Sequence, residues 1–199
     1  MPMQKTVAVL LADGFEEGEA VVFIDVVRRS GMQVDVLACK DDVVMKTYFD
    51  TRISADFTLA EKFEQDYDAV MMPGGPEGTD NLTSNPQVIA FLKRHIDAGK
   101  YICALCSSPA KVLGKHGLLE GKHFTTGSGL ETLVEKGEYL DRKVVVDGNF
   151  ITGKGLGVSF DFALTVAHTL RTDDPDHILW QADHIYYEGW PASVKRIEA

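Results

Sequence analysis

Apolar runs alternate with amphipathic segments along most of this chain. Short segments that are apolar on both sides of the backbone are typical of strands buried in a parallel sheet; they are residues 6–11, 33–39, 67–72 and 101–106. Between them, a helical spacing of apolar side chains recurs in residues 19–31, 85–100 and 108–117, with glycines suited to helix ends at Gly31 and Gly117. Strands that alternate with helices of this length predict an α/β fold, a mostly parallel sheet with helices on both faces.

Three segments depart from that alternation: residues 43–58, 143–152 and 172–199. Residues 43–58 and 143–152 read as hairpins, and the second is predicted to turn at Asp147-Gly148. A last core helix follows, up to residue 171. We therefore expect one α/β domain over residues 1–171 and a C-terminal extension, 172–199, packed on it. The extension is too apolar to be a solvated tail; its large side chains are Ile178, Leu179, Trp180, Ile185, Tyr186, Tyr187 and Trp190.

Composition and charge narrow the classes of function. The chain has 199 residues, of which 45% are hydrophobic, enough to bury a full core in one domain. Its net charge of -10 repels polyphosphates and anionic lipids, so we expect neither a nucleic acid nor a membrane as partner. Cys39, Cys103 and Cys106 form neither an even disulfide framework nor a pair with metal-ligand spacing. With no secretory pattern at residues 1–17, these features predict a cytoplasmic protein without a metal site.

The polar chemistry of the sequence lies where predicted strands end. Ligands of open α/β sheets bind at the carboxyl ends of the strands, beside the positive ends of helix dipoles. Three such ends carry acidic, glycine-rich or nucleophilic residues; they are ADGFEEGE after residue 11, PGGPEGTDN after Met72 and CSSP after Leu105. Gly74, Gly75 and Pro76 thus become candidate lining residues of a shared site.

Cys106 stands where a strand turns into a helix, which is the position of a nucleophile on a tight elbow. Backbone amides at a helix start favour a thiolate, so we expect the pKa of Cys106 to be lowered. The N–H of Ser107 and that of Gly75 would face an oxyanion formed there. One of Glu16, Glu17 and Glu19 could project inward and stay protonated beside the thiolate.

Other interpretations compete with these. A cysteine is more often a small core side chain than a nucleophile, which is our expectation for Cys39 and Cys103, and glutamates in a first helical turn often only complement the helix dipole. Residues 152–160, TGKGLGVSF, are glycine-rich like a phosphate-binding loop, but their spacing is GxGxG and not the GxGxxG of such loops. We interpret them as a loop whose backbone, at Gly155, approaches the site closely.

Four motifs together resemble the ThiJ/PfpI superfamily, and most closely its Parkinson-disease-protein branch of protein deglycases and cofactor-free glyoxalases. They are LLADGFEEGEAVVFIDVVRRSG, YDAVMMPGGPEGTDNL, ICALCSSPAKVL and GKGLGVSFDFAL, and the similarity extends over residues 5–171. It implies a flavodoxin-like (Rossmann-like) three-layer sandwich and a homodimer formed by the first helix and the neighbouring hairpin. It also implies that Cys106 is the elbow cysteine, Glu19 its protonated partner, and Gly75 and Ser107 the backbone donors.

The chain also departs from the patterns of this superfamily. Ser107 stands where the protease-like branch has histidine, and Gly127 where the deglycase branch commonly has one, while Phe49 replaces a basic residue. The residues after the cysteine are SSPA instead of the more usual AGPT. Peptidase activity is therefore not expected, and neither is glutamine amidotransferase activity, since no His-x-Glu pair follows.

The sequence is compatible with two classes of function. One is an enzyme that needs no cofactor and converts small reactive carbonyls through a Cys106 hemithioacetal, with Glu19 as proton shuttle. The other is a redox-responsive stress protein or chaperone in which Cys106 is oxidised and turnover is low. The same cysteine and acid would also serve a hydrolase or hydratase of small amides or isonitriles.

Overall fold

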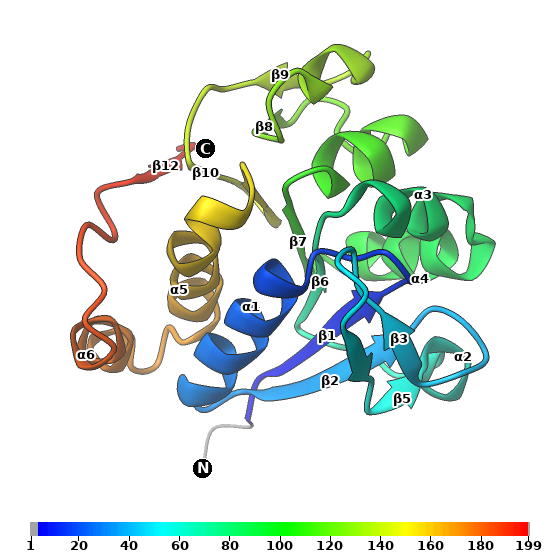
Figure 1. The fold of residues 1–199 in the computed structure, drawn as a ribbon. Helices are drawn as coiled ribbons and strands as arrows, with labels where there is room; N and C mark the ends of the chain where they lie inside the picture. The colour runs from blue at the N-terminus through cyan, green and yellow to red at the C-terminus, as the bar shows by residue number, and fades with distance from the viewer. Residues whose placement is uncertain (1–3, 199) are drawn as a thin grey trace.

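The computed structural model describes residues 4–198, which form an eight-stranded sheet covered by helices on both faces (Figure 1). The strand order is β12-β10-β11-β7-β6-β1-β2-β5, and only β10 and β11 run antiparallel to each other. This is the mostly parallel α/β architecture that the sequence predicts. The strands are β1 (Thr6–Leu11), β2 (Gln33–Ala38), β5 (Phe57–Thr58), β6 (Ala69–Met72), β7 (Tyr101–Leu105), β10 (Val144–Asp147), β11 (Phe150–Gly153) and β12 (Val194–Arg196).

Two layers of helices enclose the sheet. The helices are α1 (Glu17–Arg29), α2 (Leu59–Lys62), α3 (Pro76–Ser84), α4 (Pro86–Asp97), α5 (Ser159–Leu170) and α6 (Pro175–His184). Successive side chains of a strand point to opposite faces. In β1, Val7 and Val9 belong to the core shared with α1 and α5, whereas Ala8 and Leu10 belong to the core shared with α3 and α4. Both faces of β1 are therefore buried, which explains its unbroken apolar sequence.

Both predicted hairpins are present. The first consists of β3 (Val44–Lys46) and β4 (Arg52–Ser54), which form a separate antiparallel pair beside α1. The second is the pair β10 and β11, whose turn is Gly148-Asn149, one residue later than predicted, with Gly148 at a φ of 57°. A further small pair joins β8 (His123–Phe124) to β9 (Glu138–Tyr139).

One helix was not predicted and one predicted helix needs correction. The sequence analysis gave no helix after Met72, but α3 begins there at Pro76, since proline is well suited to a first helical position. The helix predicted over 108–117 is instead a π-helical turn, Pro109–Leu113, followed by a 3₁₀ turn, Gly114–His116. It does end at Gly117, which has the left-handed conformation of a helix C-cap.

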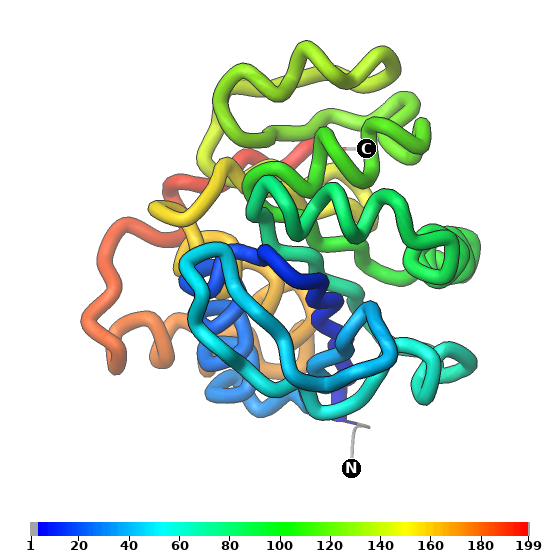
Figure 2. The backbone as a smooth tube through the Cα atoms, turned by 45° about the vertical axis from the view of Figure 1, so that its right-hand side comes forward, coloured from blue at the N-terminus to red at the C-terminus, as the bar shows by residue number. Residues whose placement is uncertain are grey.

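The segment after α5 runs along the outside of the body and returns to the sheet (Figure 2). Its strand β12 pairs in parallel with β10 and becomes the sheet edge. Trp190 is 8% exposed, and its indole N–H donates to Thr165 Oγ1 at 3.0 Å. The apolar side chains are not all packed, however, because Leu179, Trp180 and Tyr186 are 47%, 53% and 94% exposed. Within residues 4–198, no helix has the length and apolar character needed to cross a bilayer.

Candidate active site

Cys106 lies on a strained turn directly after β7. Its φ is 61°, a left-handed conformation that is uncommon for any residue other than glycine. Hydrogen bonds fix both of its backbone groups: its N–H donates to the Gly153 carbonyl at 2.9 Å, while its carbonyl accepts from Thr126 Oγ1 at 2.7 Å and from the Gly127 N–H at 2.8 Å. A strained residue held from several sides in this way is typical of a functional site.

Glu19 reaches the same place from the first turn of α1. Its side chain is completely buried, and its Oε2 accepts a hydrogen bond of 2.7 Å from the N–H of Gly74. The Cys106 thiol lies beside this carboxyl group, because the position that a Cβ on Gly74 would take is 2.9 Å from the Cys106 sulfur and 3.0 Å from Glu19 Oε2. Of the three glutamates left open by the sequence, Glu19 is therefore the one that faces the cysteine. Glu16 instead caps α1, where its side chain accepts from the Gly18 N–H.

Gly74 and Gly75 leave the space that the two functional groups occupy. A Cβ on Gly74 would lie 2.5 Å from Cys106 Cβ and 3.0 Å from Glu19 Oε2, so no side chain fits there. Gly75 precedes α3 with a φ of 103°, and a Cβ on it would lie 2.3 Å from the carbonyl oxygen of Gly14. The N–H groups of Gly75 and Ser107 lie close enough to the Cys106 sulfur to favour its thiolate form. The sulfur thus sits between two backbone donors and one carboxyl group.

Burial controls the ionisation of the pair. It raises the pKa of Glu19 to about 7, against the opposing effect of the Gly74 N–H. Burial and the nearby Glu19 carboxylate raise the pKa of Cys106 to about 12, although the amides of Ser107 and Gly75 act in the other direction. The lowered thiol pKa expected from the sequence is therefore wrong. The expectation assumed a regular helix dipole and an accessible sulfur, whereas the turn after Cys106 is π-helical and the thiol is largely buried.

Two such groups in contact titrate as one unit. Between the two pKa values, about 7 and about 12, the pair holds a single proton in total. In that range the proton is on the sulfur, and the neighbouring Glu19 carboxylate is the group placed to accept it. A protonated nucleophile beside a carboxylate base is what proton shuttling during catalysis requires.

The other predicted lining residues surround this centre at different distances. A Cβ on Gly155 would lie 3.5 Å from the Cys106 sulfur, so this backbone does approach the site closely. Gly127 lies on the carbonyl side of Cys106, where a Cβ would meet Leu130 at 3.3 Å. Pro76 occupies the exposed first position of α3.

The histidine nearest in sequence to Gly127 has its partners away from the cysteine. His123, close in sequence to Gly127, is held by Asp147 at 2.9 Å and by Glu138 at 3.2 Å. Within residues 4–198, no histidine is hydrogen-bonded to Cys106 or Glu19, and no cluster of His, Cys, Asp and Glu has a geometry that could hold a metal ion. The Glu19 carboxyl is the acid–base group that lies beside the thiol.

Sequence reasoning overlooked three hydroxyl groups around the centre. Thr126 holds the Cys106 carbonyl, and Thr79 Oγ1 lies 3.3 Å from Ser107 Oγ. Ser108 donates from its Oγ to the Pro73 carbonyl at 2.6 Å. The signals available were small hydroxyl residues next to the elbow, in SSP and TT, but nothing in the sequence showed which backbone groups they would meet.

Comparison with known proteins identifies the fold and the family. A model of the DJ-1/PfpI family matches residues 5–169, which include Glu19 and Cys106. The chain belongs to the DJ-1/PfpI family. A crystal structure of a DJ-1 superfamily protein from Salmonella typhimurium, a mutant with one cysteine replaced by alanine, superposes with a TM-score of 0.91. It is 49% identical and covers 94% of this chain and 100% of its own.

Curated relatives in this DJ-1 family differ in length and in name. The glutathione-independent glyoxalase DJR-1.2 of Caenorhabditis elegans is 34% identical, over 86% of this chain and 91% of its own length. DJ-1 homolog B of Arabidopsis thaliana is 35% identical over 80% of this chain, but the match spans only 36% of that longer protein. The family therefore includes a relative named for glyoxalase activity that aligns over nearly its whole length.

Proposed function

We propose that this DJ-1/PfpI protein is a cofactor-free, glyoxalase-like enzyme that converts small 2-oxoaldehydes into hydroxy acids. The observation that carries the proposal is the convergence of the Cys106 sulfur, the buried Glu19 carboxyl and the N–H groups of Gly75 and Ser107. The name of the C. elegans relative supports the same class of reaction. Methylglyoxal would give lactate, and glyoxal would give glycolate.

The residues present suffice for each step. The Cys106 sulfur forms a bond to the aldehyde carbon, and the thiol proton passes through Glu19 to the aldehyde oxygen, giving a hemithioacetal. The amides of Gly75 and Ser107 stabilise negative charge on that oxygen. The Glu19 carboxylate then takes the proton from the former aldehyde carbon and returns it to the neighbouring carbon, while the proton of the former aldehyde hydroxyl moves to the former ketone oxygen and leaves a thioester C=O behind. The resulting thioester is hydrolysed by water, which releases the hydroxy acid and restores the thiol.

Turnover of methylglyoxal, with lactate as the measured product, tests this proposal. Cys106→Ala should abolish turnover, and Glu19→Gln should lower kcat by about 10²-fold or more, the scale of lost general acid–base catalysis. Glu19→Asp should also lose about 10²-fold, because it withdraws the carboxyl by roughly 1 Å or more. Cys39→Ala is the matched control, since this cysteine lies away from the site, and it should retain activity. Wild-type protein without turnover, or an active Cys106→Ala variant, would refute the proposal.

The same addition chemistry would serve a deglycase, in which the carbonyl arrives as an adduct on a protein or nucleotide. Release of the unmodified amine or thiol from a methylglyoxal adduct measures that activity. Release faster than the spontaneous loss of free methylglyoxal would identify the adduct itself as substrate.

A redox role is the second candidate, and the protonated state of Glu19 favours it. Below pH 7 the carboxyl holds its proton beside a partly exposed sulfur and could donate a hydrogen bond to a sulfinate. Mass spectrometry after stepwise peroxide treatment distinguishes the two roles. Conversion of Cys106 to sulfinate without any methylglyoxal turnover would select the redox role.

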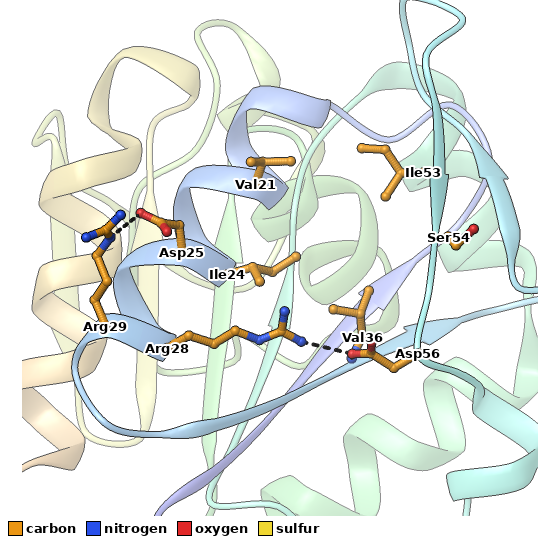
Figure 3. A pocket seen from close by; sticks show the side chains of 9 residues that line it. All are labelled: Val21, Ile24, Asp25, Arg28, Arg29, Val36, Ile53, Ser54 and Asp56. Atoms are coloured by element: carbon orange, nitrogen blue, oxygen red, sulfur yellow. Dashed lines mark hydrogen bonds and ion pairs between the residues drawn. The ribbon is translucent and has the colours of Figure 1, made fainter.

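A homodimer formed through α1 and the β3–β4 hairpin is part of the same proposal. A groove of about 330 Å³ lies between these elements. Figure 3 shows the apolar side chains of Val21, Ile24 and Ile53 in it, with the ion pairs Arg29–Asp25 and Arg28–Asp56 along its border. Val21 is 50% exposed, and Val44 on the hairpin is 44% exposed. Burial of these side chains by a second copy would remove apolar surface from water.

Light scattering coupled to size exclusion tests this interface. Val21→Asp should produce a monomer, whereas Leu179→Asp, a matched change at a 47% exposed apolar residue on α6, should leave the dimer intact. A monomeric wild type, or a dimer that survives Val21→Asp, would rule out this face.

A further inference from the structure

One peptide unit connects the turn after Cys106 to the carboxyl of Glu19. The carbonyl of Pro73 accepts a hydrogen bond from Ser108 Oγ at 2.6 Å. The N–H of the same peptide unit belongs to Gly74 and donates to Glu19 Oε2 at 2.7 Å. Ser108 and Glu19 are both completely buried. A hydroxyl group, a peptide and a carboxylate therefore form one continuous chain of hydrogen bonds away from water.

This series of hydrogen bonds lets Ser108 affect the Glu19 carboxyl in two ways. A donor on the carbonyl polarises the peptide, which makes its N–H a stronger donor at the other side. The same bond also fixes the plane of the peptide and hence the direction of that N–H. The next carbonyl, that of Gly74, is held by the Glu16 N–H at 2.9 Å. Gly74 is thus held at its N–H and its carbonyl by Glu19 and Glu16, while the preceding Pro73 carbonyl is held by the turn that follows Cys106.

We propose that Ser108 is a positioning residue for Glu19, acting through the Pro73–Gly74 peptide without touching the reacting atoms. Its role in turnover rests on the proposed function, but its effect on the Glu19 carboxyl does not. The groups that face this carboxyl and could titrate or carry charge are Cys106 and Glu16. The hydroxyl of Ser108 is bonded to neither of them, so its influence must pass through the peptide.

The two serines after the elbow cysteine have different partners. Ser107, the neighbouring serine, directs its own Oγ toward Thr79 at 3.3 Å. Only the second serine of SSP therefore contacts the peptide that holds the acid.

Infrared titration of the protein measures the protonation of Glu19 directly, because a neutral carboxyl has its own C=O stretching band. The band is assigned by its loss in Glu19→Gln. Ser108→Ala and Ser108→Gly both remove the hydroxyl, which weakens the Gly74 N–H as a donor to the carboxylate. Each should therefore raise the pH midpoint of the band by about 0.5 unit, a free energy smaller than that of one hydrogen bond to a charged group. Ser108→Thr keeps a hydroxyl and should restore the wild-type midpoint.

Ser30→Ala is the matched control. Ser30 is another completely buried serine that donates to a backbone carbonyl, that of Val26 at 2.8 Å, and it lies about 16 Å from Glu19 at the other end of α1. This variant should lose stability but keep the midpoint. Loss of stability in the Ser108 variants with an unchanged midpoint would overturn the proposal, and so would a Ser108→Thr midpoint equal to that of Ser108→Ala.

The same titration separates this inference from the proposed function. A shifted midpoint in protein that does not convert methylglyoxal would support the positioning role and refute the glyoxalase-like activity. Where turnover is present, kcat of Ser108→Ala should fall with little change in KM, because the bound substrate does not touch the hydroxyl.

Discussion

At the scale of single residues, the ionisation of Glu19 and Cys106 depends on where they are buried. A glutamate in the first turn of a helix normally faces water, where its negative charge interacts favourably with the positive end of the helix dipole. Here the chain turns that side chain inward, beside a thiol that is itself largely buried. The protein thereby keeps a substantial fraction of this carboxyl protonated near pH 7, where a solvated glutamate is fully ionised.

The raised pKa of Glu19 makes a prediction about stability. Between about pH 4.5 and 7 the folded protein holds a proton on Glu19 that the unfolded chain has lost, so this group's contribution to the free energy of unfolding falls as pH rises. The full shift corresponds to on the order of 3 kcal/mol. Glu19→Gln, which cannot ionise, should lack this decline. Urea denaturation of both proteins from pH 4 to pH 8 measures it, and parallel pH profiles would contradict it.

Reactivity of the three cysteines is a second prediction at this scale. Burial raises the pKa of Cys39 and of Cys103, and Cys103 is completely buried. Cys106 is partly exposed, and the nearby N–H groups of Ser107 and Gly75 favour its thiolate form. Brief iodoacetamide treatment near neutral pH, followed by peptide mapping, should therefore label Cys106 first, at a rate that increases with pH. Comparable labelling of Cys103 would disprove the assignment.

At the scale of elements, the site depends on how closely three backbone turns approach one another. The start of α1, the Gly74-Gly75 turn before α3 and the elbow after β7 meet at the carboxyl edge of the sheet, because β1, β6 and β7 are adjacent and parallel. Any side chain in place of Gly74 or Gly75 would hold these three turns apart. The two glycines are therefore a requirement of the packing as well as of the backbone conformation.

Substitution of Gly75 tests that requirement. Gly75→Ala adds a Cβ at a positive φ and within 2.3 Å of a backbone oxygen, so it should lower the free energy of unfolding by about 3 kcal/mol or more. Gly99→Ala is the matched control, because Gly99 has a φ of 67° but open space within 4 Å of the place where its Cβ would stand. It should lose only about 1–2 kcal/mol. Equal losses in chemical denaturation would show that packing at Gly75 is not limiting.

At the scale of the whole molecule, the C-terminal segment completes the sheet and covers α5. Strand β12 protects the edge of β10, which would otherwise expose unpaired backbone groups. Buried Asp161 of α5 accepts hydrogen bonds from Tyr187 and Ser193 of the same segment. This segment lies beyond the residues matched by the DJ-1/PfpI family. Location in the cytoplasm and the absence of nucleic-acid or membrane partners stay predictions.

The two tryptophans of the chain provide a matched test of this packing. Trp190 is 8% exposed and hydrogen-bonded to Thr165, whereas Trp180 is 53% exposed and stacks on His184. Trp190→Ala should lower the free energy of unfolding by about 3–5 kcal/mol. Trp180→Ala should change it by less than about 1 kcal/mol. Similar values for both, measured by urea denaturation, would mean that the segment adds little to the stability of the body.

The sequence by itself determined the alternation of buried strands and amphipathic helices, because the periodicity of apolar residues records which faces are buried. It also placed Glu19, Gly75 and Cys106 at strand ends that a parallel sheet brings together. It could not determine the sign of the Cys106 pKa shift, since that depends on how deeply the sulfur is buried among residues distant in sequence. The partners of Ser108 and Thr126, the start of α3 and the pairing of β12 with β10 were likewise decided by tertiary structure, because each depends on a contact between distant segments that leaves no periodic pattern in the chain.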